Sequence, residues 1–255
     1  MKHTDFIISP ITNLLNETVT ACVGVGDGMG TSTIAEHIMQ SLFLRMTGFQ
    51  EQKMKCICWE LATYDYEYRY IRFKQSPLGE CSNYREKNLV INDIISCIRK
   101  IDDSYAGLDN MSKTRIIQSV ITDTDNIVAN TNLYKWLSRQ YEDYKKIVKE
   151  IKQSQILVCG KNNTFSLFQE NKNGIGGGYK DLPFIYDKIY RHRNRCAHNT
   201  LSYQENLPTL NKLLDKDYVY ENYFLRYAIL ILIDKIVIEL YKKYLSTTDY
   251  NFAKA

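Results

Sequence analysis

The fold is decided by residues 218–244, YVYENYFLRYAILILIDKIVIELYKKY. Apolar residues recur there every three or four positions, which is the spacing of one face of an α-helix. The stripe consists of Leu225, Ile229, Leu232, Ile236 and Leu240, and it is widened by Ile231, Ile233 and Val237. A helix that is apolar over so much of its surface must pack on several sides. We therefore expect a helical bundle with this segment as its central helix.

Apolar residues also recur at helical spacing through most of the remaining chain, and only four prolines interrupt its 255 residues. A capping box at Thr33 begins one helix, for which Gly48 provides an end. Further helices are predicted around 91–98 and 133–151, and one more from about Leu182 through His198. The sequence therefore predicts an all-α fold.

Two segments in the N-terminal half fit this helical pattern less well. Thr18–Val25 is rich in β-forming residues, and Tyr64–Phe73 alternates aromatic with charged residues at a period of two. This pattern allows a minor β-hairpin in the N-terminal half.

The sequence shows no internal repeat and no clear linker, so its division is coarse. We assign residues 1–130 to an N-terminal helical region of no named family, 131–246 to a C-terminal helical core and 247–255 to a tail. The first two are expected to pack as one compact unit. A loop that is rich in glycine is predicted over 160–180.

Charge and cysteine content exclude several classes of protein. The 33 Lys and Arg against 29 Asp and Glu leave a net charge of +4, which is too small for polyanion binding over the whole surface. The seven cysteines are odd in number and include no C-x-x-C pair, which is typical of reduced thiols in a cytosol. The four histidines do not accompany these cysteines at metal-ligand spacing, so we expect neither a metal site nor a cofactor.

No stretch of the sequence predicts export or a membrane segment. The first ten residues, MKHTDFIISP, lack the apolar run of a secretory signal. The most apolar run, 228–233, is far shorter than the roughly 20 residues that span a bilayer. We expect a cytoplasmic protein.

Residues 191–199, RHRNRCAHN, concentrate three arginines and two of the four histidines. From Lys180 to His198 the chain carries five basic residues against two acidic ones. Arginine offers phosphate oxygens a planar fork that is always charged, and histidine moves protons near neutral pH. The combination suits chemistry on a phosphodiester.

Helical periodicity places Arg193 in the middle of an apolar stripe. The stripe consists of Leu182, Tyr186, Ile189 and Ala197. An unpaired buried charge is costly, so Arg193 must have a charged partner or face a second subunit or a ligand. Asn194 and His198, four residues apart, lie on the adjacent flank with Arg191. The polar residues therefore lie at the edge of a packing face, which suits a site shared between subunits.

The string R-N-R-C-A-H, residues 193–198, resembles the motif of the HEPN superfamily. In that motif a polar residue follows an arginine, and a histidine comes after four to six intervening residues. Arg193, Asn194 and His198 match it with four intervening residues. Arg191 fits the six-residue version of the spacing, but Arg193 is favoured because Asn194 follows it and because it lies in the apolar stripe.

The resemblance implies a specific activity. It covers about residues 132–245, which would form a HEPN-like C-terminal core with the motif helix followed by a long apolar helix. HEPN domains are typically metal-independent endoribonucleases whose two motifs meet across a dimer interface, and many act as toxins or in abortive-infection defence against phage. The implied partners are therefore RNA, a second copy of the chain with which it forms a composite active site, and an antitoxin or other regulatory protein.

The resemblance also gives each motif residue a role. His198 acts as general base on the RNA 2′-hydroxyl or as general acid on the leaving 5′-oxygen. Arg193 holds the scissile phosphate and stabilises its charge, and Asn194 orients the phosphate or the imidazole. Arg191 and Arg195 are weaker candidates for substrate contacts. The products are a 2′,3′-cyclic phosphate and a 5′-hydroxyl, and the need for a 2′-hydroxyl makes RNA the substrate and excludes DNA.

Plainer interpretations of the same residues stay open. Arg and His near the end of a helix complement its dipole and pair with nearby acids, here Asp181 or Asp187. A non-catalytic HEPN-like module that holds a partner protein or RNA would use the same helical face.

Two other segments suggest ligand sites and are better explained as structure. The glycines of 24–30 lack the lysine of a phosphate-binding loop, so we predict a connecting loop there. The tyrosines of 64–70, interleaved with Arg69 and followed by Arg72, suit the stacking of single-stranded bases. Tyrosine is common throughout this chain, however, with 20 copies, so half-buried aromatic packing is the favoured explanation.

Overall fold

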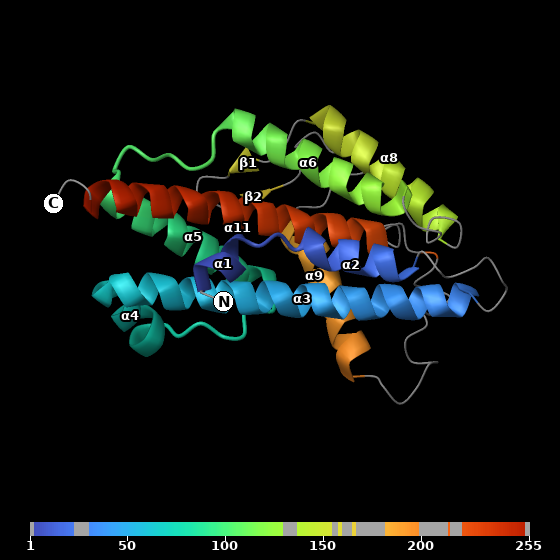
Figure 1. The fold of residues 1–255 in the computed structure, drawn as a ribbon, viewed down its shortest axis with the longest axis horizontal. Helices are drawn as coiled ribbons and strands as arrows, with labels where there is room; N and C mark the ends of the chain where they lie inside the picture. The colour runs from blue at the N-terminus through green and yellow to red at the C-terminus, as the bar shows by residue number, and fades with distance from the viewer. Residues whose placement is uncertain are drawn as a thin grey trace.

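The structure, a computed structural model, is a bundle of α-helices over the described part of the chain (Figure 1). It describes residues 3–22, 31–129, 137–154, 158–159, 165–166, 182–198, 214 and 221–252. The helices are α1 (His3–Ile8), α2 (Thr12–Cys22), α3 (Thr31–Tyr64), α4 (Tyr66–Tyr70), the π-helix η1 (Ile71–Gln75), α5 (Tyr84–Ile101), α6 (Asn110–Ala129), α8 (Ser138–Ser154), α9 (Leu182–His198) and α11 (Tyr223–Phe252). Two-residue strands, β1 (Val158–Cys159) and β2 (Phe165–Ser166), form an antiparallel pair. The prediction of an all-α fold is confirmed.

Helix α11 runs along the centre of the bundle, in contact with α1, α3, α5, α6 and α8 (Figure 1). Both the predicted stripe and the residues that widen it are buried, namely Leu225, Ile229, Ile231, Leu232, Ile233, Ile236, Val237 and Leu240. The prediction that this helix packs on several sides is confirmed. Asn222 caps it by accepting hydrogen bonds from the backbone N–H groups of Phe224 at 2.9 Å and Leu225 at 3.2 Å.

Helix α11 also continues beyond its predicted end. It reaches Phe252, so residues 247–252, which were assigned to a tail, are helical. The hydroxyls of Thr247 and Thr248 donate to the carbonyl oxygens of Lys243 at 2.7 Å and Tyr244 at 2.9 Å. Both bonds run from a threonine to the carbonyl oxygen four residues earlier, the usual way in which a threonine inside a helix satisfies its hydroxyl.

Helix α3 spans 34 residues without a break, a length of about 51 Å at 1.5 Å per residue. The predicted end at Gly48 is wrong. A glycine within a helix costs only about 1 kcal/mol relative to alanine. Buried side chains before and after it, such as Met46 and Met54, anchor the helix on both sides of this position. The chain before and after Gly48 therefore belongs to one helix.

The β-hairpin that the sequence allowed in the N-terminal half is not found among the residues that the structure describes there. The described part of 18–25 lies in α2, and Tyr64–Phe73 forms the end of α3, α4 and most of η1. Asp65 caps α4 by accepting a hydrogen bond at 2.9 Å from a backbone N–H of its first turn. Arg72 of η1 donates two hydrogen bonds, of 2.7 and 2.6 Å, to Asp93 of α5. The cap and the ion pair stabilise helical backbone despite the alternating pattern.

A buried ion pair joins α3 to α11. Lys53 Nζ lies 2.5 Å from Asp234 Oδ1 and 2.6 Å from the carbonyl oxygen of Ser9. The other carboxylate oxygen of Asp234 accepts a hydrogen bond from the Ile11 N–H at 2.9 Å. The two charged side chains are 0% and 1% exposed. The pair thus holds the connection between α1 and α2 against both long helices.

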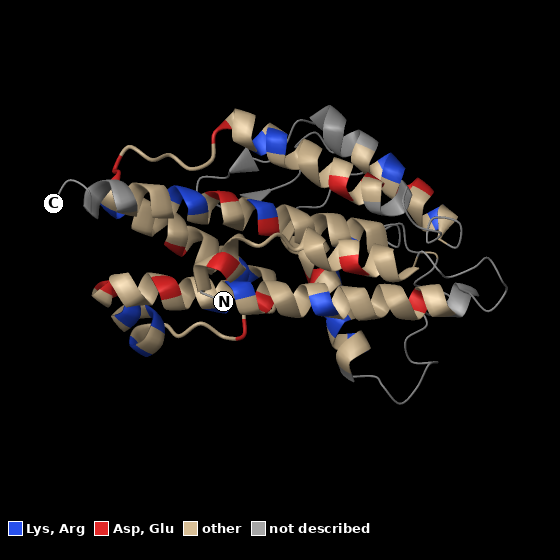
Figure 2. Cartoon of the chain, in the orientation of Figure 1, with Lys and Arg blue, Asp and Glu red and all other residues tan. Residues whose placement is uncertain are grey.

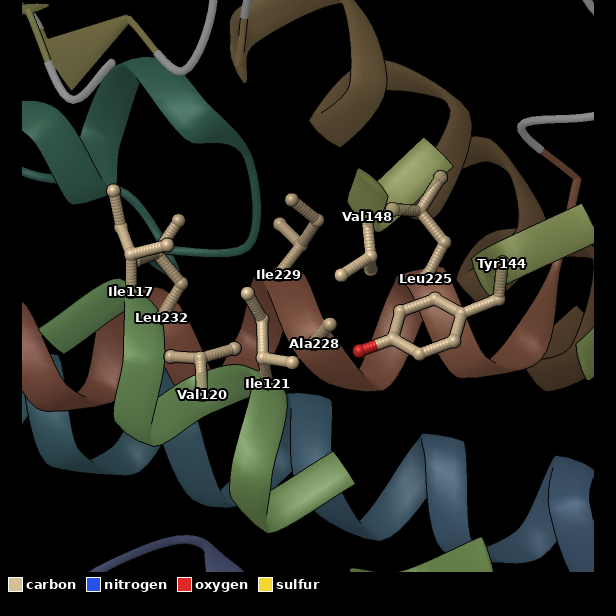
Figure 3. Close-up of a pocket in the computed structure, with 9 residues that line it drawn as sticks. All are labelled: Ile117, Val120, Ile121, Tyr144, Val148, Leu225, Ala228, Ile229 and Leu232. Carbon is tan, nitrogen blue, oxygen red and sulfur yellow. The ribbon is translucent and has the colours of Figure 1, made fainter. Parts of the chain in front are cut away.

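A small apolar cavity of about 30 Å³ lies between α6, α8 and α11 (Figure 3). It is lined by Ile117, Val120, Ile121, Tyr144, Val148, Leu225, Ala228, Ile229 and Leu232. Small-molecule sites usually enclose about 300–1,000 Å³. The cavity is therefore too small to hold a nucleotide.

Charges of both signs are distributed along the described helices (Figure 2). No described helix is long and apolar enough to cross a membrane. Several predicted segments fall outside the described residues: the loop with the glycines of 24–30, the start of the helix predicted at 133–151, and the glycine-rich loop 160–180 apart from β2.

Candidate active site on helix α9

Helix α9 has the predicted bounds, Leu182–His198. Its buried side chains are Leu182, Ile185, Tyr186 and Ile189, and the helix packs against α3 and α5. Residues 190–197 range from half-buried to exposed, and Ala197, which was predicted in the apolar stripe, is exposed. In Figure 1 α9 crosses α3 and extends beyond it on one side. The first half of α9 therefore anchors the helix, and the second half presents the motif residues at the edge of the bundle.

The charged partner that position 193 requires is Glu51 of α3. Arg193 Nη2 lies 3.2 Å from Glu51 Oε2, and Nη1 donates to Asn194 Oδ1 at 3.3 Å. The arginine side chain is 28% exposed and the glutamate 13%. The pair is thus only partly shielded from water, so a ligand has access to the guanidinium while Glu51 and Asn194 fix its position.

A second group of charges lies where α9 approaches the start of α11. Arg195 Nη2 lies 3.3 Å from Glu221 Oε2. The same carboxylate oxygen lies 2.8 Å from Arg226 Nη2. Two guanidinium groups therefore share one carboxylate, and positive charge exceeds negative charge within this triad.

Arg226 is the most deeply buried arginine of this group, with 4% of its side chain exposed. Its guanidinium carbon lies 4.9 Å from the Tyr223 ring centroid and 5.9 Å from that of Phe43, distances that are typical of cation–π contacts. Its Nε has no hydrogen-bond partner among the described residues. Burial lowers the pKa of Arg226, although an arginine remains charged in proteins. The two rings and Glu221 together offset part of the cost of burying this charge.

His192, the other histidine of the segment, is packed into this second group. Its Nε2 lies 3.1 Å from the Tyr223 hydroxyl and 3.5 Å from Cys196 Sγ, and its ring centroid lies 5.2 Å from that of Phe43. Burial raises the pKa of both Tyr223 and Cys196. The phenol and the thiol therefore stay protonated at neutral pH, and Cys196 is not an activated nucleophile.

The remaining motif candidates are Arg191 and His198. Arg191 Nε lies 2.8 Å from Asp187 Oδ2, with the two side chains 72% and 51% exposed, which is the pairing that the plain helix-end interpretation predicts. His198 is the last residue of α9, and its side chain lies outside the described part of the structure. At 100° per residue, position 198 lies on the same side of the helix as Arg191 and Asn194, and about 140° from Arg193.

The sequence pattern did not identify four charged residues that lie near the motif, namely Glu51, Lys87, Glu221 and Arg226. Arg226 does carry a signal, because it interrupts an apolar helical stripe as Arg193 does. Glu51 carries none, since it is 142 residues from Arg193 in the chain and no local pattern connects them.

Lys87 of α5 is buried completely near the motif arginine. Its Nζ lies 5.7 Å from the Tyr186 ring centroid and has no hydrogen-bond partner among the described residues. Burial lowers its pKa to about 8, an effect that the negative charge of Glu51 partly opposes. A buried lysine without a close partner is expected to destabilise the folded state.

We therefore expect Lys87→Met to stabilise the protein at neutral pH. The lysine pKa of about 8 in the fold lies below its ordinary value of 10.5, which corresponds to a penalty of about 3 kcal/mol on the folded state. The penalty is fully present below about pH 8 and fades toward about pH 10.5, where the lysine is neutral in both states. Urea unfolding of both proteins across this pH range measures the difference.

A matched control for this prediction is Lys146→Met, at a lysine that is 72% exposed. The control is expected to show no comparable trend with pH. A Lys87→Met variant that is less stable than the wild type at pH 7 would contradict the assignment of a strained, buried ammonium.

Within the described residues, no group of three or more His, Cys, Asp or Glu side chains is positioned to hold a metal ion. Comparison with known proteins found no matching family model, no matching curated protein and no matching solved structure. A functional assignment therefore depends on the residues around Arg193 and on their chemistry.

Proposed function

We propose that this protein is a HEPN-like, metal-independent endoribonuclease that cleaves RNA by attack of a 2′-hydroxyl on the adjacent phosphate. The placement of Arg193 carries the proposal. Its guanidinium is 28% exposed and is held by Glu51 and Asn194 at the edge of the bundle. An arginine that is fixed in this way and open to solvent suits a phosphate whose charge must be stabilised during the reaction.

The reaction requires one general base and one general acid. In the first role His198 removes the proton from the 2′-hydroxyl, whose oxygen bonds to phosphorus as the bond from phosphorus to the 5′-oxygen breaks. The departing 5′-oxygen takes a proton from the general acid, a role for which His198 of the second copy is available. The products are a 2′,3′-cyclic phosphate and a 5′-hydroxyl, and no further reactant is consumed.

A second copy of the chain completes the site in this proposal. Positions 193 and 198 are about 140° apart around α9, so Arg193 and His198 of one chain do not share a helix face. Two copies related by twofold symmetry can bring the histidine of each close to the arginine of the other. The half-buried to exposed residues 191–197 provide a surface for this contact.

The neighbouring arginines would contribute unequally to RNA binding. Arg191 is held only by an exposed ion pair with Asp187, which is weak and easily exchanged for a phosphate. Arg195 is tied to Glu221, which also holds Arg226. We therefore place Arg191 ahead of Arg195 as a substrate contact.

The proposed cellular role is that of a cytoplasmic toxin or an antiviral effector of the abortive-infection type. Uncontrolled cleavage of RNA would harm the cell that makes the enzyme. The proposal therefore includes an antitoxin or other regulatory partner that restrains the enzyme until it is needed.

A non-catalytic HEPN-like module that holds a partner protein or RNA is the second candidate. The ion pair between Arg193 and Glu51 favours it, because this guanidinium already has a carboxylate partner without any phosphate. In that case His198→Ala leaves the function intact. Substitutions at Tyr186 or Ile189, which are both 1% exposed, would disrupt either function by weakening the core.

Incubation of total cellular RNA with purified protein in excess EDTA tests the enzyme directly. We expect the wild type to produce new ends with a cyclic phosphate on one side and a 5′-hydroxyl on the other. His198→Ala, purified in parallel, controls for contaminating ribonucleases. A folded, dimeric wild-type protein that cleaves no RNA, with or without added cell extract, would contradict the proposal and favour the binding module.

A further inference from the structure

Helix α4 lies beside one end of α3, at one end of the bundle (Figure 1). Exposed aromatic side chains occur there on α3, α4 and η1. We define the aromatic surface as Trp59, Tyr66, Tyr70 and Phe73, which are 59%, 76%, 46% and 52% exposed. The rings of Trp59 and Phe73 lie 6.5 Å apart, edge to face, so α3 and η1 contribute to one area. Soluble proteins seldom expose several large aromatic side chains in one place without a binding role.

Cations accompany two of these rings. The guanidinium carbon of Arg69 lies 5.9 Å from the Tyr66 ring centroid, and Lys74 Nζ lies 5.9 Å from that of Tyr70. Neither cation takes part in an ion pair with the described residues. The segment from Arg69 to Lys74 contains three basic residues and no acidic one, and basic residues appear on α4 and η1 in Figure 2. The surface thus offers aromatic faces and positive charge together.

Ion pairs with α5 hold the backbone of α4 and η1 in place. Arg72 is bound by both carboxylate oxygens of Asp93. Lys100 Nζ of α5 lies 2.8 Å from Oδ2 of Asp65, the N-cap of α4, and 2.8 Å from Oε2 of Glu67, in the first turn of α4. A surface that is already ordered loses less conformational entropy when a ligand binds.

We propose that the aromatic surface binds single-stranded RNA, with unpaired bases stacked on its rings and with Arg69 and Lys74 at the phosphates. The choice of RNA rests on the proposed function. Stacking on aromatic rings beside cations is the usual means of holding single strands, because every base has a flat face and every nucleotide a negative charge. A protein partner would need the apolar area but not a cation beside the rings, so the arrangement favours nucleic acid.

The aromatic surface is connected to the motif arginine along α3. Glu51, which holds Arg193, is followed at four-residue intervals by Lys55 and Trp59, a spacing that places all three on one side of the helix. The rise over the eight residues from Glu51 to Trp59 is about 12 Å. Bases stacked about 3.4 Å apart cover that distance in roughly four nucleotides. The aromatic surface is thus placed to hold RNA next to the scissile phosphate.

Binding can be measured without cleavage in the His198→Ala background. The probe is a fluorescein-labelled, unstructured RNA of about 12 nucleotides, and anisotropy reports its binding. Adding Trp59→Ala, Tyr66→Ala and Tyr70→Ala together is expected to weaken binding by about 100-fold or more, since each stacked base contributes roughly 5- to 150-fold. Adding Met111→Ala instead, at an apolar side chain of α6 that is 79% exposed, should leave the affinity unchanged.

The fluorescence of Trp59 gives a second readout. The chain has two tryptophans, so the substitution Trp136→Phe leaves Trp59 as the only source of indole emission. Single-stranded RNA is expected to quench this emission, whereas duplex RNA of the same sequence should not, because its bases are already paired and stacked. Single-stranded DNA should also quench it, because stacking does not require the 2′-hydroxyl.

The outcomes separate this inference from the ribonuclease proposal. Weaker RNA binding by the aromatic variant, with normal binding by Met111→Ala, supports the inference whether or not the wild type cleaves RNA. Equal affinity of the aromatic variant and its parent, or equal affinity for duplex and single-stranded RNA, overturns it even if cleavage occurs. Aromatic variants that keep full RNA affinity but lose a bound protein also overturn it and assign the surface to a protein partner.

Discussion

Replacing His198 by alanine is expected to slow RNA cleavage by about 100- to 10,000-fold. This is the usual contribution of a positioned general acid or base. Because the proposal gives the chain one motif histidine, both proton transfers in a dimer depend on position 198. The measurement is the initial rate of cleavage of an end-labelled RNA in EDTA, with circular dichroism to show that the variant is folded.

Two other histidines provide matched controls. His37 is exposed on α3, so His37→Ala should leave the cleavage rate unchanged. His192 is packed against Phe43 and Tyr223, so His192→Ala should lower the stability by about 1 kcal/mol without the same loss of rate per folded molecule. Cyclic-phosphate ends produced by His198→Ala at the wild-type rate would remove this histidine from the mechanism.

Replacing Asp234 by alanine is expected to reduce the free energy of unfolding by about 3–5 kcal/mol. The change leaves the ammonium of Lys53, which is 0% exposed, without its carboxylate. It also removes the acceptor for the Ile11 N–H, so the connection between α1 and α2 loses its attachment to α11. Urea denaturation followed by circular dichroism measures the loss.

The double variant Lys53→Met/Asp234→Leu distinguishes the cost of leaving a buried charge unpaired from the cost of lost packing. Removing both charges avoids an unpaired buried ion, so the double variant should recover most of the stability that Asp234→Ala loses. Lys235→Ala, at a neighbouring lysine that is 23% exposed and paired with Asp123, should cost less than about 1 kcal/mol. An Asp234→Ala variant as stable as Lys235→Ala would contradict the role of the buried pair.

Helical periodicity was sufficient to predict where α9 and α11 lie, because each carries a continuous apolar stripe whose pattern is local in the sequence. The same method failed where distant contacts override local preferences. Gly48 has a low helix propensity, but buried side chains on both sides of it keep α3 intact. The alternation in Tyr64–Phe73 suggested a strand, but Arg72 is held by Asp93 from another helix.

Only the part of the candidate site that lies on α9 could be predicted from the sequence. An arginine within an apolar stripe was expected to have a charged partner or to face a second subunit or a ligand, and the structure shows the first of these, at Glu51. That reasoning could not identify Glu51 or Lys87, which belong to other helices and follow no local pattern. The exposure of Tyr66 and Tyr70 could not be predicted either, because the sequence does not show which tyrosines of the segment are buried. In the structure Tyr68 is buried, whereas Tyr66 and Tyr70 are exposed.

The division of α9 into an anchored half and an exposed half has an evolutionary consequence. Substitutions among the buried residues of 182–189 would weaken the core, whereas substitutions at the exposed positions 191 and 197 should cost no more than about 0.5 kcal/mol. Selection can therefore alter the exposed positions of α9 with less effect on the fold than the anchoring ones. If the chain is the proposed ribonuclease, substitution of His198 alone would therefore be expected to convert it into the proposed binding module.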